Sequence, residues 1–122
     1  MGEERRNFVR LQKRHRVNYR LIVDTYANES VPANSSYTEN ISGSGMLMLS
    51  SKKYENGVKF EMEIEINDGD NEPIECVGEV IDSEEVSANE YNIKIKFIDI
   101  DNPVRDRLAR YIIREDVKLR KK

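Results

Sequence analysis

Residues 58–66 alternate strictly between apolar and charged side chains, and this pattern limits the fold more than any other feature. Every second residue from Val58 to Ile66 is apolar, and those between are Lys or Glu. A period of two puts the apolar set on one face of a β-strand and the charged set on the other. The turn-like residues 67–71 and Pro73 follow. The chain therefore predicts half-buried strands joined by turns.

Five further stretches complete this pattern. Residues 15–27 and 90–98 alternate in the same way, and residues 46–49 and 74–81 are short apolar runs. Residues 37–41 are predicted as a short strand after an Asn- and Ser-rich loop at 28–36. Strands joined so closely form an antiparallel sheet, and six of them curl into a small barrel.

The hydrophobic period changes after residue 101. Asn102 is expected to cap a helix whose first residue is Pro103. Apolar residues then recur at helical spacing, at Val104, Leu108, Tyr111 and Ile112. We therefore predict one domain with a basic arm (residues 1–14), a barrel (15–101), an amphipathic helix (102–117) and a polar, frayed tail (118–122).

Charge is segregated along the chain. The net charge of -3 results from basic ends at residues 1–20 and 102–122 and an acidic middle at 55–101. A protein with a pI near 5.3 lacks the basic surface of a general DNA-coating protein. No apolar run approaches the ~18 residues of a membrane span, and the single cysteine fits a reducing compartment. We expect a cytoplasmic protein without membrane insertion.

Residues suited to catalysis or metal binding are scarce. His15 is the only histidine and lies in a basic run, where it is expected to titrate without a catalytic role. Cys76 lies within an apolar strand, where it is expected to be a small core residue. Asp68 and Asp70 resemble a calcium loop, but the bidentate Glu at the twelfth position is absent. We expect no enzyme, no metal and no cofactor.

Two polar clusters remain. Arg5, Arg6 and Arg10 place guanidinium groups near the N-terminus, and such groups bind phosphate oxygens and the O6/N7 edge of guanine. Alone, a basic arm of this kind is usually a solvated charge run. The second cluster is the turn at residues 40–45, where short polar side chains alternate with glycines.

Together the clusters have a known spacing. Arg6-x-x-x-Arg10, followed about thirty residues later by Asn40-x-Ser42-x-x-Gly45, resembles the PilZ family of bacterial cyclic di-GMP receptors. The order of arm, strand, motif turn, strands and terminal helix is also similar, from about residue 5 to residue 113. The resemblance implies a six-stranded barrel of the split-barrel type.

The resemblance also implies a ligand and a mechanism. Arg6 and Arg10 would contact phosphate and guanine, Asn40 and Ser42 a guanine edge, and Gly45 would keep the backbone clear. Arg5 accompanies two stacked ligands per chain in this family. With few apolar anchors, the arm at residues 5–14 is expected to be mobile until the ligand orders it and alters contacts with an unidentified protein partner.

Two alternatives stay open. A small barrel with a basic arm can bind nucleic acid, but its aromatics should then lie on an exposed face for stacking. The pattern instead places Phe60, Tyr91 and Phe97 on the core side, so we expect no DNA or RNA partner. The second alternative is an adaptor of PilZ fold that binds only proteins.

Overall fold

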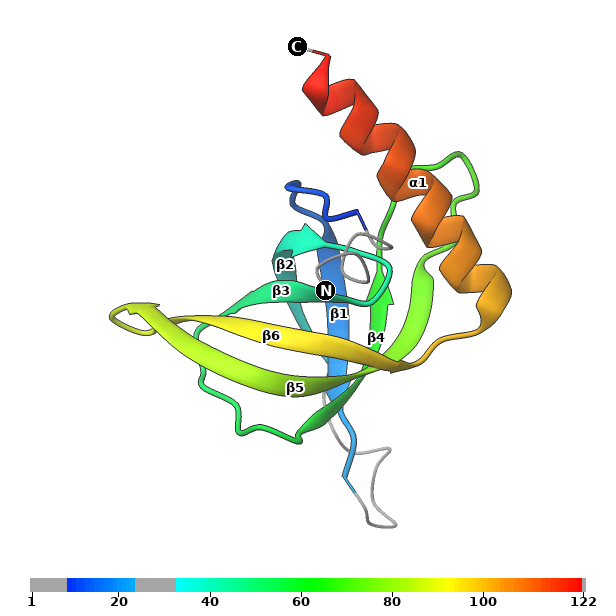
Figure 1. Cartoon of the computed structure of the whole chain (residues 1–122). Helices are drawn as coiled ribbons and strands as arrows, with labels where there is room; N and C mark the ends of the chain where they lie inside the picture. The colour runs from blue at the N-terminus through cyan, green and yellow to red at the C-terminus, as the bar shows by residue number, and fades with distance from the viewer. Residues whose placement is uncertain (1–8, 24–32, 122) are drawn as a thin grey trace, which may run out of the picture.

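In the part of the chain that the structure describes, six antiparallel strands close into a barrel and one helix follows them (Figure 1). The structure is a computed structural model that describes residues 9–23 and 33–121. The strand order around the barrel is β1-β2-β3-β6-β5-β4, so the predicted barrel with a C-terminal helix is confirmed. The elements are β1 (Arg16–Leu21), β2 (Asn34–Ile41), β3 (Gly45–Ser50), β4 (Lys59–Ile64), β5 (Ile74–Ser87), β6 (Glu90–Asp99) and α1 (Asn102–Arg120).

The core fills the barrel as the alternation predicts. In β4, Phe60, Met62 and Ile64 are buried, and the residues between them are exposed. Helix α1 adds Leu108, Tyr111 and Ile112 to the same hydrophobic cluster. The predicted packing of the helix stripe on the barrel is therefore confirmed.

Strand ends differ from the prediction where polar residues pair. Strand β2 begins at Asn34, inside the expected loop, because Asn34 pairs with Tyr19 of β1. Strand β1 ends at Leu21, and residues 24–27 of the predicted strand lie outside the described residues. Periodicity of apolar residues does not detect segments whose strand structure rests on ladder hydrogen bonds alone.

The largest difference is in β5, which continues to Ser87 instead of ending at residue 81. Its polar second half pairs with β6, with Glu84 opposite Asn92 and Ser87 opposite Glu90. Asn89 turns the hairpin with a φ of 59°, a conformation that Asn tolerates well. This ribbon extends away from the barrel (Figure 1), so it buries little and gives no hydrophobic pattern.

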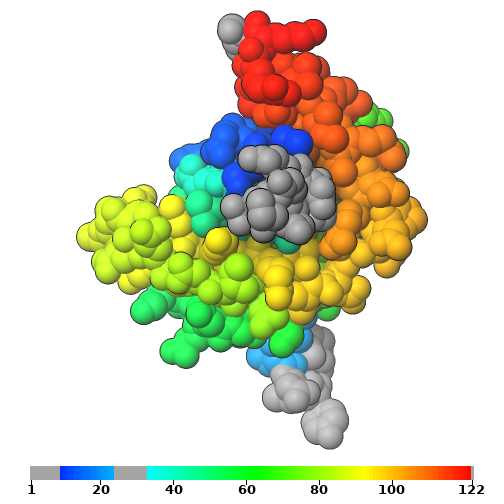
Figure 2. Space-filling view, in the orientation of Figure 1, coloured from blue at the N-terminus to red at the C-terminus, as the bar shows by residue number. Residues whose placement is uncertain are grey.

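Both ends of α1 also differ. Asp101 is the N-cap, without a side-chain cap hydrogen bond, so Asn102 is the first helical residue and Pro103 the second. The helix continues to Arg120, so the predicted frayed tail from 118 is wrong up to that residue. An ion pair of 3.0 Å joins Arg120 to Asp116 one turn earlier. In Figure 2 these last turns stand clear of the barrel.

Candidate functional site

The structure joins the two polar clusters through one hydrogen bond. Nη1 of Arg10 donates to Oδ1 of Asn40 over 2.7 Å, across a sequence separation of 30 residues. Arg10 is exposed, whereas Asn40 is 9% exposed. The amide oxygen thereby holds a forked cation at the barrel surface. Arg5 and Arg6 lie outside the described residues, so their places at the site stay predictions.

The arm is anchored to the barrel at Leu11. This residue exchanges two backbone hydrogen bonds with Ile41, of 2.7 and 3.0 Å, and its side chain is fully buried. A few residues later, the backbone N–H of His15 donates to the hydroxyl of Thr38 over 3.0 Å. Leu11, one of the few apolar residues expected to anchor the arm, is therefore anchored, and the expected mobility of residues 5–14 without ligand stays a prediction. The anchoring fixes the backbone next to Arg10.

Ser42 builds the turn between β2 and β3. Its N–H donates to the carbonyl of Gly45 over 2.9 Å, and its hydroxyl accepts the N–H of Ser44 over 3.2 Å. Only 2% of Ser42 is exposed, whereas Ser44 is exposed. The serine thus shapes the turn from inside, and its expected contact with a guanine edge stays a prediction.

Gly45 is required by the packing of two strands. A Cβ on Gly45 would lie 2.2 Å from the carbonyl oxygen of Ile95 and 3.2 Å from the Cα of Lys96 in β6. Real side chains do not approach a backbone oxygen so closely. The expectation from the sequence assigned this glycine to ligand clearance, whereas the structure gives it a role in the contact between β3 and β6.

A comparison with protein families decides the identity of this arrangement. The profile of the PilZ domain matches residues 4–114, which include the arm, the motif turn and all six strands. The chain belongs to the PilZ domain family. No curated protein matches the chain.

Solved structures show the same PilZ fold at low sequence identity. The inhibitor of motility MotI/DgrA of Bacillus subtilis is 17% identical with a TM-score of 0.74, and the match covers 97% of this chain and 53% of that one. The PilZ domain of YcgR from Escherichia coli, solved with c-di-GMP, is 15% identical with a TM-score of 0.64 and coverages of 96% and 95%. MrkH of K. pneumonia is 13% identical with a TM-score of 0.65 and coverages of 93% and 51%. This chain thus spans about half the length of MotI and MrkH.

His15, the first residue after the arm, contacts the helix of this PilZ domain. Nε2 of His15 lies 2.8 Å from the hydroxyl of Tyr111, and the two rings meet edge to face. Burial lowers the pKa of His15, and the positive charge of Lys13 lowers it further. His15 is therefore a buried residue in contact with α1, which its place in a basic run did not predict. The sequence did contain a sign of this burial. His15 is two residues before Val17 and four before Tyr19, so a period of two places it on the same face as these core residues.

A second contact joins the same two elements. Nζ of Lys13 lies 3.2 Å from a carboxylate oxygen of Glu115, which also pairs with Lys118 over 3.0 Å. Hydrogen bonding to Lys118 and Lys13 lowers the pKa of Glu115. Lys13 in the arm and His15 just after it therefore contact α1 at two places, one at the surface and one buried.

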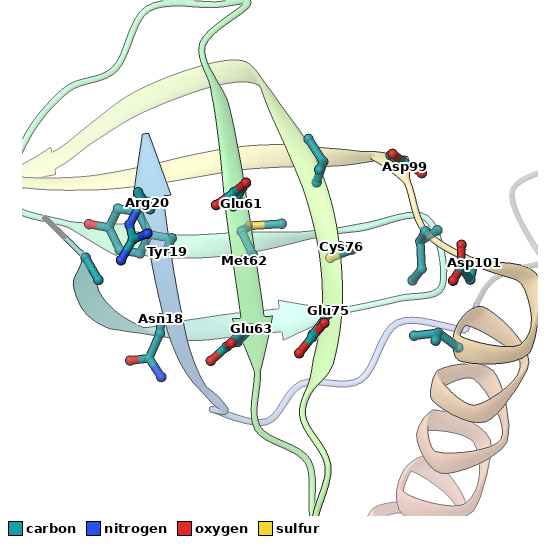
Figure 3. A pocket seen from close by; sticks show the side chains of 14 residues that line it. Asn18, Tyr19, Arg20, Glu61, Met62, Glu63, Glu75, Cys76, Asp99 and Asp101 are labelled. Carbon is teal, nitrogen blue, oxygen red and sulfur yellow. The ribbon is translucent and has the colours of Figure 1, made fainter. Parts of the chain in front are cut away.

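An acidic groove of about 550 Å³ lies on another wall of the PilZ barrel (Figure 3). It shares no residue with the two motifs. Among the lining residues that the structure describes, Arg20 is the only basic one. The groove is unsuited to a phosphate-bearing ligand, because carboxylates repel anions. Its acidic residues are Glu61, Glu63, Glu75, Asp99 and Asp101.

The turn that resembled a calcium loop is tied to α1 instead. The guanidinium of Arg107 donates two hydrogen bonds to the carboxylate of Asp68, of 2.7 and 3.1 Å, and a third to the carbonyl of Glu72. The hydrogen bond from Arg107 lowers the pKa of Asp68. The carboxylate of Asp68 is therefore bound by a side chain of α1, which agrees with a structural role for this turn.

The rest of the described chain offers little reactive chemistry. Cys76 is buried, which raises the pKa of its thiol to about 12, so the thiol stays protonated at neutral pH. Among residues 9–23 and 33–121, no three His, Cys, Asp or Glu side chains are placed to hold a metal ion. In the same ranges, no helix has the length and apolar character needed to cross a membrane.

Proposed function

We propose that this PilZ domain is a bacterial receptor for cyclic di-GMP, which binds between the arm and the turn of residues 40–45. The observation that carries the proposal is the hydrogen bond from Arg10 to Asn40. It places a guanidinium beside a polar turn, next to an anchored backbone. The YcgR domain, a structural neighbour over nearly the whole of both chains, was solved with c-di-GMP.

The ligand and the site have complementary chemistry. Cyclic di-GMP carries two phosphodiester charges and two guanine bases. Arg10 provides a fork of donors for phosphate or for the O6/N7 edge of guanine. Because Asn40 already accepts from Arg10 through Oδ1, its two amide hydrogens are left to donate to the ligand.

We further propose that two cyclic di-GMP molecules bind per chain. Arg5 and Arg6 would add positive charge to Arg10 and offset the charge of a second dianion. These two arginines, with Ser42 and Gly45 of the turn, complete the proposed set of binding residues.

The signal would pass from the arm to α1. Ligand that orders the segment before Leu11 would shift the backbone that continues through Lys13 to His15. Those residues contact Glu115 and Tyr111 of the helix. The C-terminal turns of α1 stand clear of the barrel and are available to a protein partner in the cytoplasm (Figure 2). The output in this account is a changed protein contact, with no catalytic step.

Calorimetric titration with cyclic di-GMP tests the binding. Wild-type protein should bind with a stoichiometry near two, and Arg10→Ala should lose about 10- to 100-fold in affinity, the effect of one bidentate contact. Arg20→Ala is the matched control, because Arg20 is exposed on β1 and borders the acidic groove. Absence of binding by the wild type would refute the proposed function. Full affinity in Arg10→Ala would refute the site.

Amide exchange tests the transmission. Ligand should slow exchange in the arm and also around Glu115 in α1. Tyr111→Phe removes the hydroxyl next to His15 and should reduce the effect on the helix while the arm is still protected. Equal protection of α1 in wild type and variant would show that the signal takes another route.

A further inference from the structure

Strand register extends the site beyond the two motifs. Asn40 of β2 lies opposite Leu47 of β3, and Leu47 lies opposite Lys94 of β6. Directly opposed residues share a face of the sheet. This is the outer face, because the neighbouring pair of Ile41 and Met46 is buried in the core. The partner of Arg10 and the amine of Lys94 thus border the same stretch of barrel surface.

A second lysine lies beside the first. Lys96 is opposite Gly45, the last residue of the motif turn, and both Lys94 and Lys96 are exposed. Period-two alternation puts their side chains on the same outer face. On this outer face β2 carries Asn40, which is hydrogen-bonded to Arg10 of the arm, β3 carries Gly45 and Leu47, and β6 carries the two lysines.

The lysines are available for an anion. Their neighbours on β5 are acidic, with Asp82 opposite Lys94 and Glu79 opposite Lys96. Even so, within residues 9–23 and 33–121 neither lysine forms an ion pair within 4.0 Å. Exposed amines without a fixed ion-pair partner can bind an anionic ligand while losing few existing contacts.

The surface between the two basic edges suits a flat, doubly charged ligand. Gly45 has no side chain, and Leu47 is half-buried and apolar. Neighbouring strands lie about 4.8 Å apart, so the backbones of β2 and β6 are about 10 Å apart across β3. A guanine base can lie over the apolar middle while phosphates reach both edges.

We propose that Lys94 and Lys96 form a second cationic edge of the ligand site and bind the phosphodiester groups that point away from Arg10. The inference rests on the proposed function and adds two residues to its site. Neither of the two motifs includes Lys94 or Lys96. The ligand class is a cyclic dinucleotide, with one anionic group held from β6 and another held from the arm.

The test compares charge-neutral variants by calorimetry with cyclic di-GMP. Lys94→Gln/Lys96→Gln should lose about tenfold in affinity, as expected for two exposed ion pairs. The loss should shrink when salt rises from about 50 to about 300 mM, because salt screens exposed charges. Lys52→Gln/Lys53→Gln removes the same charge from the exposed loop after β3, away from the motif turn, and should bind as the wild type does.

The outcomes separate the two proposals. Wild-type affinity in Lys94→Gln/Lys96→Gln at low salt, together with a weakened Arg10→Ala, overturns the second edge and leaves the proposed function intact. An equal loss in the loop variant overturns it as well, since the effect would then come from net charge. Absence of binding by the wild type overturns both. Thermal unfolding checks that each variant is folded.

Discussion

Arg10 and Asn40 are hydrogen-bonded over 2.7 Å, although 30 residues separate them in sequence. The amide fixes one end of a guanidinium that would otherwise sample many rotamers, and fixing it in advance reduces the entropy lost on binding. Asn40 therefore has two roles in this account. It positions Arg10, and it offers its amide hydrogens to the ligand.

A double-mutant cycle separates these roles. Arg10→Ala and Asn40→Ala should each weaken binding of cyclic di-GMP, and the loss in the double variant should be smaller than the sum of the two single losses, because part of the effect of Asn40 acts through Arg10. Calorimetry measures the four affinities. Asn18→Ala, which removes a similar amide from β1, is the matched control. Strictly additive losses would show that Asn40 does not position Arg10.

Gly45→Ala tests the role of the glycine in the barrel. The new Cβ would meet the backbone of Ile95, so β3 or β6 must shift. We expect a loss of about 1–3 kcal/mol in the free energy of unfolding, typical of overpacking. Chemical denaturation of the ligand-free protein measures it, with Ser44→Ala as the control in the same turn. Unchanged stability with lost binding would return the glycine to a role in ligand clearance.

His15 predicts how stability depends on pH. Its pKa in the folded protein is below the ordinary value of 6.5, because burial disfavours the charged ring. The unfolded chain therefore binds a proton first as pH falls. Stability should be at its full value above pH 6.5 and should decrease as pH falls from 6.5 toward the lower pKa of the folded state.

His15→Gln is the variant for this measurement. It should be less stable at pH 7.5 but should show a flatter pH dependence between about 7 and 5.5, where His15 is the group that titrates. Unfolding free energies at several pH values measure both effects. The carboxylates of Asp68 and Glu115 have lowered pKa values, so their contribution is lost only in more acidic solution. If the unfolding free energy of the variant depends on pH as steeply as that of the wild type, a group other than His15 causes this dependence.

The sequence predicts the barrel well where one face is apolar. Strands such as β4 are specified by burial, and burial leaves a period of two. The polar half of β5 and the start of β2 have no such pattern, because backbone pairing with a neighbour stabilises them. The end of α1 was missed for a similar reason. Ion pairs such as that of Arg120 with Asp116 extend a helix without any apolar stripe.

The site is predictable in part. The resemblance to the two PilZ motifs brought Arg10 and Asn40 to one hypothesis, and the structure places them in contact. Ser42 is needed for hydrogen bonds within the turn, and Gly45 is needed because β6 approaches it closely. No local sequence pattern indicates either role. The links of His15 and Lys13 to α1 are contacts between distant segments, so only the folded chain displays them.

Chemical-shift titration of the ¹⁵N-labelled protein with cyclic di-GMP tests the central claim most directly, because it reports binding and its location together. The account predicts saturable shifts that are largest at Arg10, Asn40, Ser44 and Gly45, with smaller ones at Lys94 and Lys96. Glu63 and Glu75, in the acidic groove on another wall, should be unaffected. Absence of shifts, or shifts centred on that groove, would contradict the account.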